Sequence, residues 1–126
     1  MLGAYDFVTI VEAEDNEQMA KFSLELGVKA GVHIGFGTDA GIYPHGENAR
    51  QFAYMVRYGL SPLGAIRSAT IDAARCLGKE RDLGSVAPGK YADMIAVTGD
   101  PLADVETLRK IAGVIKEGRL ITGGNP

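Results

Sequence analysis

Asp39 stands where an α/β enzyme would place a catalytic carboxylate. It ends the short, apolar, glycine-interrupted segment 31–39, a pattern that predicts a strand buried on both faces of a parallel sheet. Carboxylates at the C-terminal ends of such strands gather at the active sites of α/β barrels. There Asp39 could bind a divalent cation or accept a proton from metal-bound water. The structural alternative is that Asp39 only caps the turn that follows it.

The two histidines are further candidates. His45 lies in the loop after the predicted strand, where it could be a metal ligand, a proton shuttle, a substrate contact or an ordinary surface residue. For His33, within the strand, we expect a place in the core or barrel lining rather than a ligand role. A catalytic zinc site usually has three protein ligands, and the sequence holds no His-x-His and no Cys-x-x-Cys. By itself the sequence therefore contains no complete metal-hydrolase site.

The predicted strand has two unlike faces, because successive side chains of a strand point to opposite sides. One face carries small or polar residues, namely His33, Gly35, Gly37 and Asp39. The other face carries the larger residues, namely Ile34, Phe36 and Thr38. A tight barrel interior with helices packed outside would need this division. We expect Ile34 and Phe36 to pack on the helices of residues 47–77 or on a second subunit.

Helix signals surround this segment. A helix should follow Asp15 and end at Gly27, and a second should cover 47–57 and end at Gly59. Ser61 and Thr70 are expected to cap two more, the later of which spans 71–77 and holds Cys76, predicted to be buried.

Strand patterns occupy the two ends of the chain. Residues 5–12, 92–97, 113–116 and 119–122 read as strands, with a hairpin turn at 117–118 and a short helix over 105–109 capped by Asp104. The fold class is therefore α/β to α+β.

Composition limits the functions available to the chain. At 126 residues it is too short for a complete barrel, which needs about 200–250. The 13 basic and 16 acidic residues give a net charge of −3, which argues against a nucleic-acid binder. The sequence shows no apolar run that could span a membrane and no signal peptide. With a single cysteine, we expect a cytoplasmic protein.

The motif Gly37-Thr38-Asp39-Ala40-Gly41, followed by Pro44-His45-Gly46-Glu47-Asn48, resembles the amidohydrolase superfamily. The closest branch is the imidazolonepropionase-like and Xaa-Pro dipeptidase-like metal hydrolases. The resemblance continues through residues 59–70, 73–78, 83–95 and 114–119 and covers about residue 28 to the C-terminus. It implies the terminal segment of a (β/α)₈ barrel, with one barrel strand plus helices, and a few strands of the small β-sandwich.

The resemblance also implies roles for single residues. Asp39 would be the metal-binding Asp of the eighth barrel strand and the proton acceptor for the attacking water. His45 and Asn48 match active-site loop positions near the substrate. The cofactor would be a divalent metal, zinc, and the substrate a small peptide or amide. The family's other ligands lie on earlier strands, so we expect the isolated chain to be inactive.

Residues 1–28 differ in character from residues 29–126, which form the amidohydrolase segment. Residues 3–27 resemble part of a GYD domain, a small α+β fold, and would form a strand-helix unit. A chimeric or truncated gene product would explain the join. The alternative function is a non-catalytic α+β module that self-associates, and on either interpretation we expect a homo-oligomer.

Overall fold

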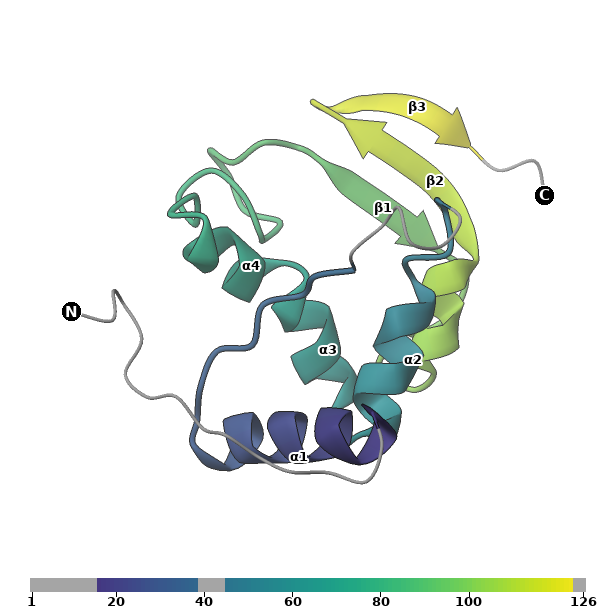
Figure 1. The fold of residues 1–126 in the computed structure, drawn as a ribbon. Coiled ribbons are helices and arrows are strands. Elements are labelled where there is room, and N and C mark those ends of the chain that lie inside the picture. The colour runs from purple at the N-terminus through teal and green to yellow at the C-terminus, as the bar shows by residue number, and fades with distance from the viewer. Residues whose placement is uncertain (1–15, 39–44, 124–126) are drawn as a thin grey trace.

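The computed structural model describes residues 16–38 and 45–123 (Figure 1). Helices occupy the first part and an antiparallel sheet the second. The elements in order are α1 (Asn16–Lys29), α2 (Arg50–Arg57), α3 (Pro62–Ser68), α4 (Ile71–Cys76), β1 (Met94–Val97), the 3₁₀ helix η1 (Val105–Arg109), β2 (Ile111–Lys116) and β3 (Arg119–Gly123). The predicted strand over 5–12 lies outside the described residues. No helix in the described ranges is long and apolar enough to cross a bilayer.

Glycines end the helices as predicted at two places. Gly59 and Gly78 have φ of +115° and +63°, values that L-residues with a Cβ rarely adopt. After α2, the N–H of Gly59 donates to Val56 O at 3.1 Å and the N–H of Leu60 to Met55 O at 3.0 Å. This pair of bonds is the Schellman arrangement, which satisfies carbonyls that the helix end leaves open.

The end of α1 differs from the prediction. Gly27 lies inside the helix, and Gly31, with φ +68°, takes the terminating position. The bonds from Gly31 N to Val28 O and from Val32 N to Gly27 O close the helix. An ideal Cβ on Gly27 would lie 3.2 Å from Cδ1 of Ile34, so this glycine serves close packing instead.

The helix starts are capped by different means. Ser61 Oγ accepts from Gly64 N at 3.0 Å, and Pro62 occupies the first helical position of α3. Asp104 caps η1 by accepting from Glu106 N. Thr70 makes no such cap on α4, because its hydroxyl donates to Ile66 O of the preceding helix.

The sheet has the order β1-β2-β3, with both pairings antiparallel. A two-residue turn joins β2 to β3, and both of its residues have positive φ, +50° at Glu117 and +76° at Gly118. Two successive positive φ values are typical of a type I′ hairpin turn, whose twist matches that of the strands. The predicted hairpin is therefore confirmed.

The core lies where α2, α3 and the segment 32–38 meet. Met55, Leu60 and Ala65 are buried at its centre. Half-buried apolar side chains pack around them, namely Leu24, Ile34, Phe36, Phe52 and Val56. The rings of Phe36 and Phe52 stack with centroids 4.7 Å apart. The prediction that Ile34 and Phe36 pack on the following helices is thus confirmed.

The segment 32–38 is not a strand, although residues 31–39 were expected to form one. A strand needs a neighbouring strand to complete its hydrogen-bond ladder. Here Phe36 N donates to Ser68 O, at the end of α3, at 3.0 Å instead. The packing is what the sequence predicts, but within the described residues the segment has no strand beside it. Its place in a barrel stays a prediction.

Candidate functional site

The segment that leads to Asp39 has the two predicted faces. Ile34, Phe36 and Thr38 are half-buried, whereas His33, Gly35 and Gly37 are exposed. The face that would line a barrel interior is therefore open to solvent at these three positions. Asp39, the predicted metal ligand, lies outside the described residues.

Side chains near α2 bind the end of this segment. Gln51 Nε2 donates to Gly37 O at 2.9 Å, and Asn48 Nδ2 lies 3.5 Å from Thr38 Oγ1. Both donors come from the beginning of α2 or the turn before it. The structure thus brings Asn48, a predicted substrate-binding residue, next to the residue that precedes Asp39 in the sequence.

Asn48 also carries a polar atom that the fold leaves open. Its Oδ1 is buried and has no hydrogen-bond partner among the described residues. A buried carbonyl oxygen without a partner is costly, which makes it a candidate acceptor for a ligand or for another part of the chain. His45, the other predicted loop residue, is exposed in the turn that leads to α2.

A hollow of about 270 Å³ lies along one side of α2. Three of its lining residues, Arg50, Gln51 and Tyr54, share one face of α2, and the fourth, Glu47, lies just before the helix. Arg50 is paired with Glu47, and this hydrogen bond and charge raise the pKa of Arg50. Our sequence reasoning missed this group, although the spacing of its polar side chains is visible in the sequence.

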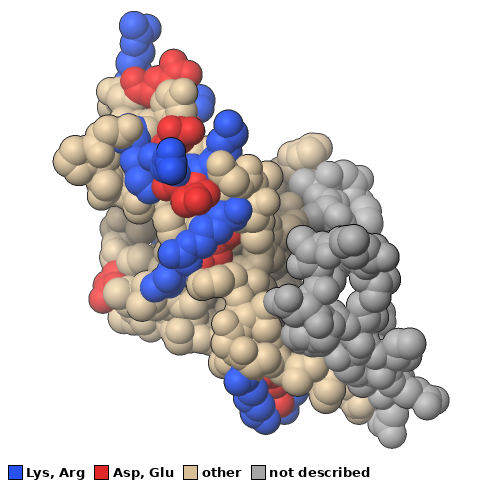
Figure 2. Space-filling view, turned by 90° about the vertical axis from the view of Figure 1, so that its left-hand side faces the viewer, with Lys and Arg blue, Asp and Glu red and all other residues tan. Residues whose placement is uncertain are grey.

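A second missed group surrounds Asp72 on α4. Its carboxylate is buried and lies 3.0 Å from His33 Nδ1, 3.0 Å from Arg75 NH1 and 4.0 Å from Arg67 Nε. His33 is therefore an exposed partner of a buried acid, so the prediction that it is buried in the core is wrong, and its place in a barrel lining stays a prediction. Cys76, predicted to be buried, is exposed. Figure 2 shows the Lys, Arg, Asp and Glu side chains interspersed on the face of the molecule turned to the viewer.

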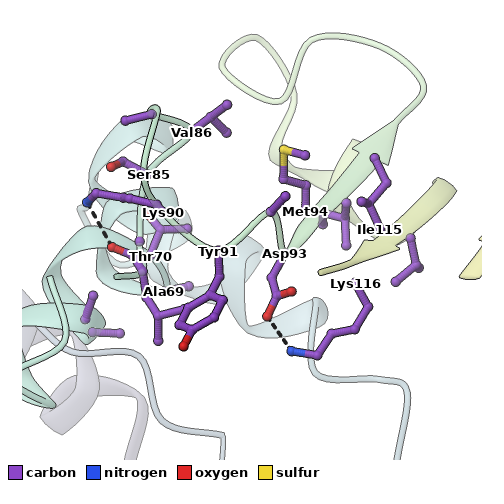
Figure 3. A pocket seen from close by; sticks show the side chains of 18 of the residues that line it. Ala69, Thr70, Ser85, Val86, Lys90, Tyr91, Asp93, Met94, Ile115 and Lys116 are labelled. Carbon is purple, nitrogen blue, oxygen red and sulfur yellow. Dashed lines mark hydrogen bonds and ion pairs between the residues drawn. The ribbon is translucent and has the colours of Figure 1, made fainter. Parts of the chain in front are cut away.

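A larger hollow of about 870 Å³ separates α4 and the chain after it from the sheet (Figure 3). Its lining is mostly apolar. On one side Lys90 Nζ donates to Leu83 O at 3.1 Å, and on the sheet side Asp93 pairs with Lys116. The hydrogen bond from Lys116, with a second from Glu117 N, lowers the pKa of Asp93, and Asp93 raises the pKa of Lys116. Lys90 thus fixes the chain that follows α4, and the Asp93–Lys116 pair ties the residue before β1 to the end of β2.

The described residues do not assemble a metal centre on their own. Within residues 16–38 and 45–123, no group of three or more His, Cys, Asp and Glu could hold a metal ion. Two buried side-chain oxygens of these residues have no hydrogen-bond partner, Asn48 Oδ1 and Thr107 Oγ1, and the first lies at the predicted site. Asp39, the predicted carboxylate ligand, lies outside these ranges.

Comparisons with known proteins give one consistent result. The sequence profile described as "Amidohydrolase family" matches residues 9–121. An ochratoxinase of Aspergillus niger is 37% identical over 101 residues, which are 76% of this chain and 21% of the relative.

Two solved structures share the fold. A crystal structure described as a Xaa-Pro dipeptidase with bound methionine in the active site is 44% identical, with a TM-score of 0.77 over 82% of this chain and 25% of that one. A prolidase complexed with N-methylphosphonate-L-proline is 31% identical, with a TM-score of 0.73 over 82% and 26%. The chain thus spans about a quarter of these structures and a fifth of the curated relative.

Proposed function

The chain belongs to the amidohydrolase family, and on that basis we propose that it forms the C-terminal part of an active site that hydrolyses C–N bonds. The observation that carries this proposal is the position of Asn48. Its amide nitrogen lies against Thr38, and its buried Oδ1 has no partner among the described residues. An unpartnered acceptor beside Thr38, the residue before Asp39, supports a substrate-binding role for Asn48.

We propose separate roles for the three predicted site residues. Asp39 would hold the divalent metal, zinc, and accept a proton from the attacking water. When bound, such a metal polarises the scissile carbonyl and activates water. Asn48 would accept a hydrogen bond from the substrate through Oδ1, and the exposed His45 would contact the substrate from the loop.

The described residues fit a metal only in part, because Asn48 Oδ1 is an unpartnered oxygen near the predicted site but no cluster of ligands surrounds it among these residues. We therefore propose that further ligands come from barrel strands outside these 126 residues, and that the isolated chain is inactive. The cytoplasm remains the proposed compartment, in agreement with a single, exposed cysteine.

The proposed substrate is a dipeptide or another amide with an amino-acid half. Support comes from the structural relatives, one of which binds methionine in its active site and another a phosphonate derivative of L-proline. A curated relative is named an ochratoxinase, so related chains are not all named as dipeptidases.

A chimeric enzyme tests the proposal. In it, residues 29–126 replace the corresponding segment of the 44%-identical Xaa-Pro dipeptidase. We expect metal-dependent hydrolysis of Xaa-Pro dipeptides, a loss of about two orders of magnitude or more in kcat with Asp39→Asn, and a smaller loss with Asn48→Ala. Ser85→Ala, in an exposed loop, serves as the control. A folded chimera whose activity survives Asp39→Asn would contradict the proposal.

The sheet favours a second candidate, a non-catalytic module that self-associates. Ile95, Leu120 and Ile121 are all more than half exposed on β1 and β3. Exposed apolar strands at the edges of a sheet favour pairing with another chain. Light scattering separates the two functions. A metal-free oligomer that Leu120→Glu dissociates and Asp39→Asn leaves intact supports the module, and a monomer at high concentration argues against it.

A further inference from the structure

The hollow beside α2 is a recess that lies close to the proposed active site, and polar groups project from a lining that is mostly apolar by area. Its four lining side chains offer a carboxylate, a guanidinium, an amide and a phenol, from Glu47, Arg50, Gln51 and Tyr54. Gln51 also donates to Gly37 O at 2.9 Å, which ties the recess to the segment that carries Asp39 two residues later.

The charges of this recess are balanced. Glu47 and Arg50 form an ion pair and are each about half exposed, at 47% and 50% of the side chain. A guanidinium has five N–H donors, and its contact with Glu47 runs through NH1, so other donors can reach a ligand. Glu47 likewise has a second carboxylate oxygen. A simple anion would gain from Arg50 but be repelled by Glu47.

A ligand with both charges close together avoids this repulsion. In the zwitterion of an α-amino acid, one carbon separates the carboxylate from the ammonium group. We propose that this recess binds the zwitterion of a free α-amino acid, with the carboxylate on Arg50 and the ammonium group on Glu47. Tyr54, which shares the recess, would contact the side chain or the carboxylate.

This inference deepens the proposed function and rests on it, because such hydrolysis would release a free amino acid. The recess would then hold the product, or the equivalent end of a substrate, beside the reacting centre. Arg50 and Glu47 would be specificity-determining residues that select amino acids over uncharged amides. Arg50 projects from α2 and Glu47 from the segment just before it, and both side chains are about half exposed, so substitutions there should leave the fold intact.

Calorimetric titration of the 126-residue chain with L-methionine tests this assignment. We expect saturable binding in the millimolar range, weakened about tenfold or more by Arg50→Gln and by Glu47→Gln. Methioninamide, which lacks the carboxylate, and N-acetylmethionine, which lacks the ammonium group, should both bind more weakly than methionine. Arg57→Gln is the matched control, because Arg57 lies on the same helix outside the recess and pairs with Glu17.

Each outcome decides the proposal. The absence of saturable binding, or equal losses with Arg50→Gln and Arg57→Gln, would overturn it. Binding that survives Arg50→Gln but requires Asp39 and added zinc would overturn it while supporting the metal site. Binding that depends on Arg50 and is unchanged by Asp39→Asn supports the recess even if the chimeric enzyme fails, so the two proposals fail separately.

Discussion

Nδ1 of His33 lies 3.0 Å from Oδ1 of Asp72, so an imidazole that is 61% exposed is bound to a carboxylate that is 10% exposed. The contact joins the segment 32–38 to α4, about 40 residues later in the sequence. Two arginines, Arg67 and Arg75, lie at the same carboxylate. One buried acid thus contacts an imidazole and two guanidinium groups, from His33, Arg67 and Arg75.

Asp72→Ala should remove this junction. We expect the free energy of unfolding to fall by about 1–2 kcal/mol, the lower part of the range for hydrogen bonds to charged groups, because the three partners are themselves well exposed. Urea denaturation measures the change. Asp82→Asn, which alters an exposed carboxylate in the following loop, should change stability by less than about 0.5 kcal/mol. Equal losses in the two variants would show that the junction contributes nothing specific.

Phe36→Ala tests the packing of the segment on α2. The ring of Phe36 stacks on Phe52 and is half-buried, so its loss should cost about 2–3 kcal/mol, less than a fully buried phenylalanine. Val32→Ala is the matched control from the same segment, because Val32 is 45% exposed and should cost under about 1 kcal/mol. Thermal and urea unfolding both measure this difference. A Phe36→Ala variant as stable as the control would mean that the segment is not held by this contact.

The alternation of Ile34 and Phe36 with small residues was enough to predict which side of the segment packs on the helices. It was not enough to predict a strand, because the hydrogen bonds of a strand come from another segment, and here Ser68 accepts the bond from Phe36 instead. A glycine after a helical pattern predicts the end of a helix, and this prediction is correct at Gly59 and Gly78 and wrong at Gly27. The first two adopt positive φ, whereas Gly27 is small because Ile34 approaches it.

The candidate site was predictable only where the family motif runs through it. Asn48 came from the motif, and its contact with Thr38 agrees with a place beside the end of the segment. His33 was misplaced because its partner, Asp72, is distant in sequence and no local pattern announces it. The boundary at residue 28 and the GYD-like segment before it remain predictions.

Asp93→Asn should change how stability depends on pH. Lys116 and Glu117 N lower the pKa of Asp93, so its contribution is present above its unfolded pKa of about 4 and is lost as the pH falls through the folded value. Lys116 has a raised pKa, so its contribution is present below about pH 10 and is lost as the pH rises through the folded value. The wild type should therefore exceed the variant in melting temperature at pH 7, and the gap should close as the pH falls below the unfolded pKa of about 4 and through the lower folded value. A gap that stays constant with pH would contradict the assignment.

Gly84→Ala should be the most damaging small substitution in the described part of the chain. Gly84 has φ +87°, and an ideal Cβ there would lie 2.8 Å from both Ala74 Cβ and Ile71 Cα, so backbone as well as side chain would have to move. Gly89 separates strain from collision, because its φ is nearly the same, +86°, with nothing within 4 Å of the added carbon. We expect Gly89→Ala to cost about 1 kcal/mol from backbone strain alone, and Gly84→Ala to cost at least about 2 kcal/mol more. Urea denaturation of both variants measures the difference. Equal costs would show that the chain after α4 can move away from the helix without penalty.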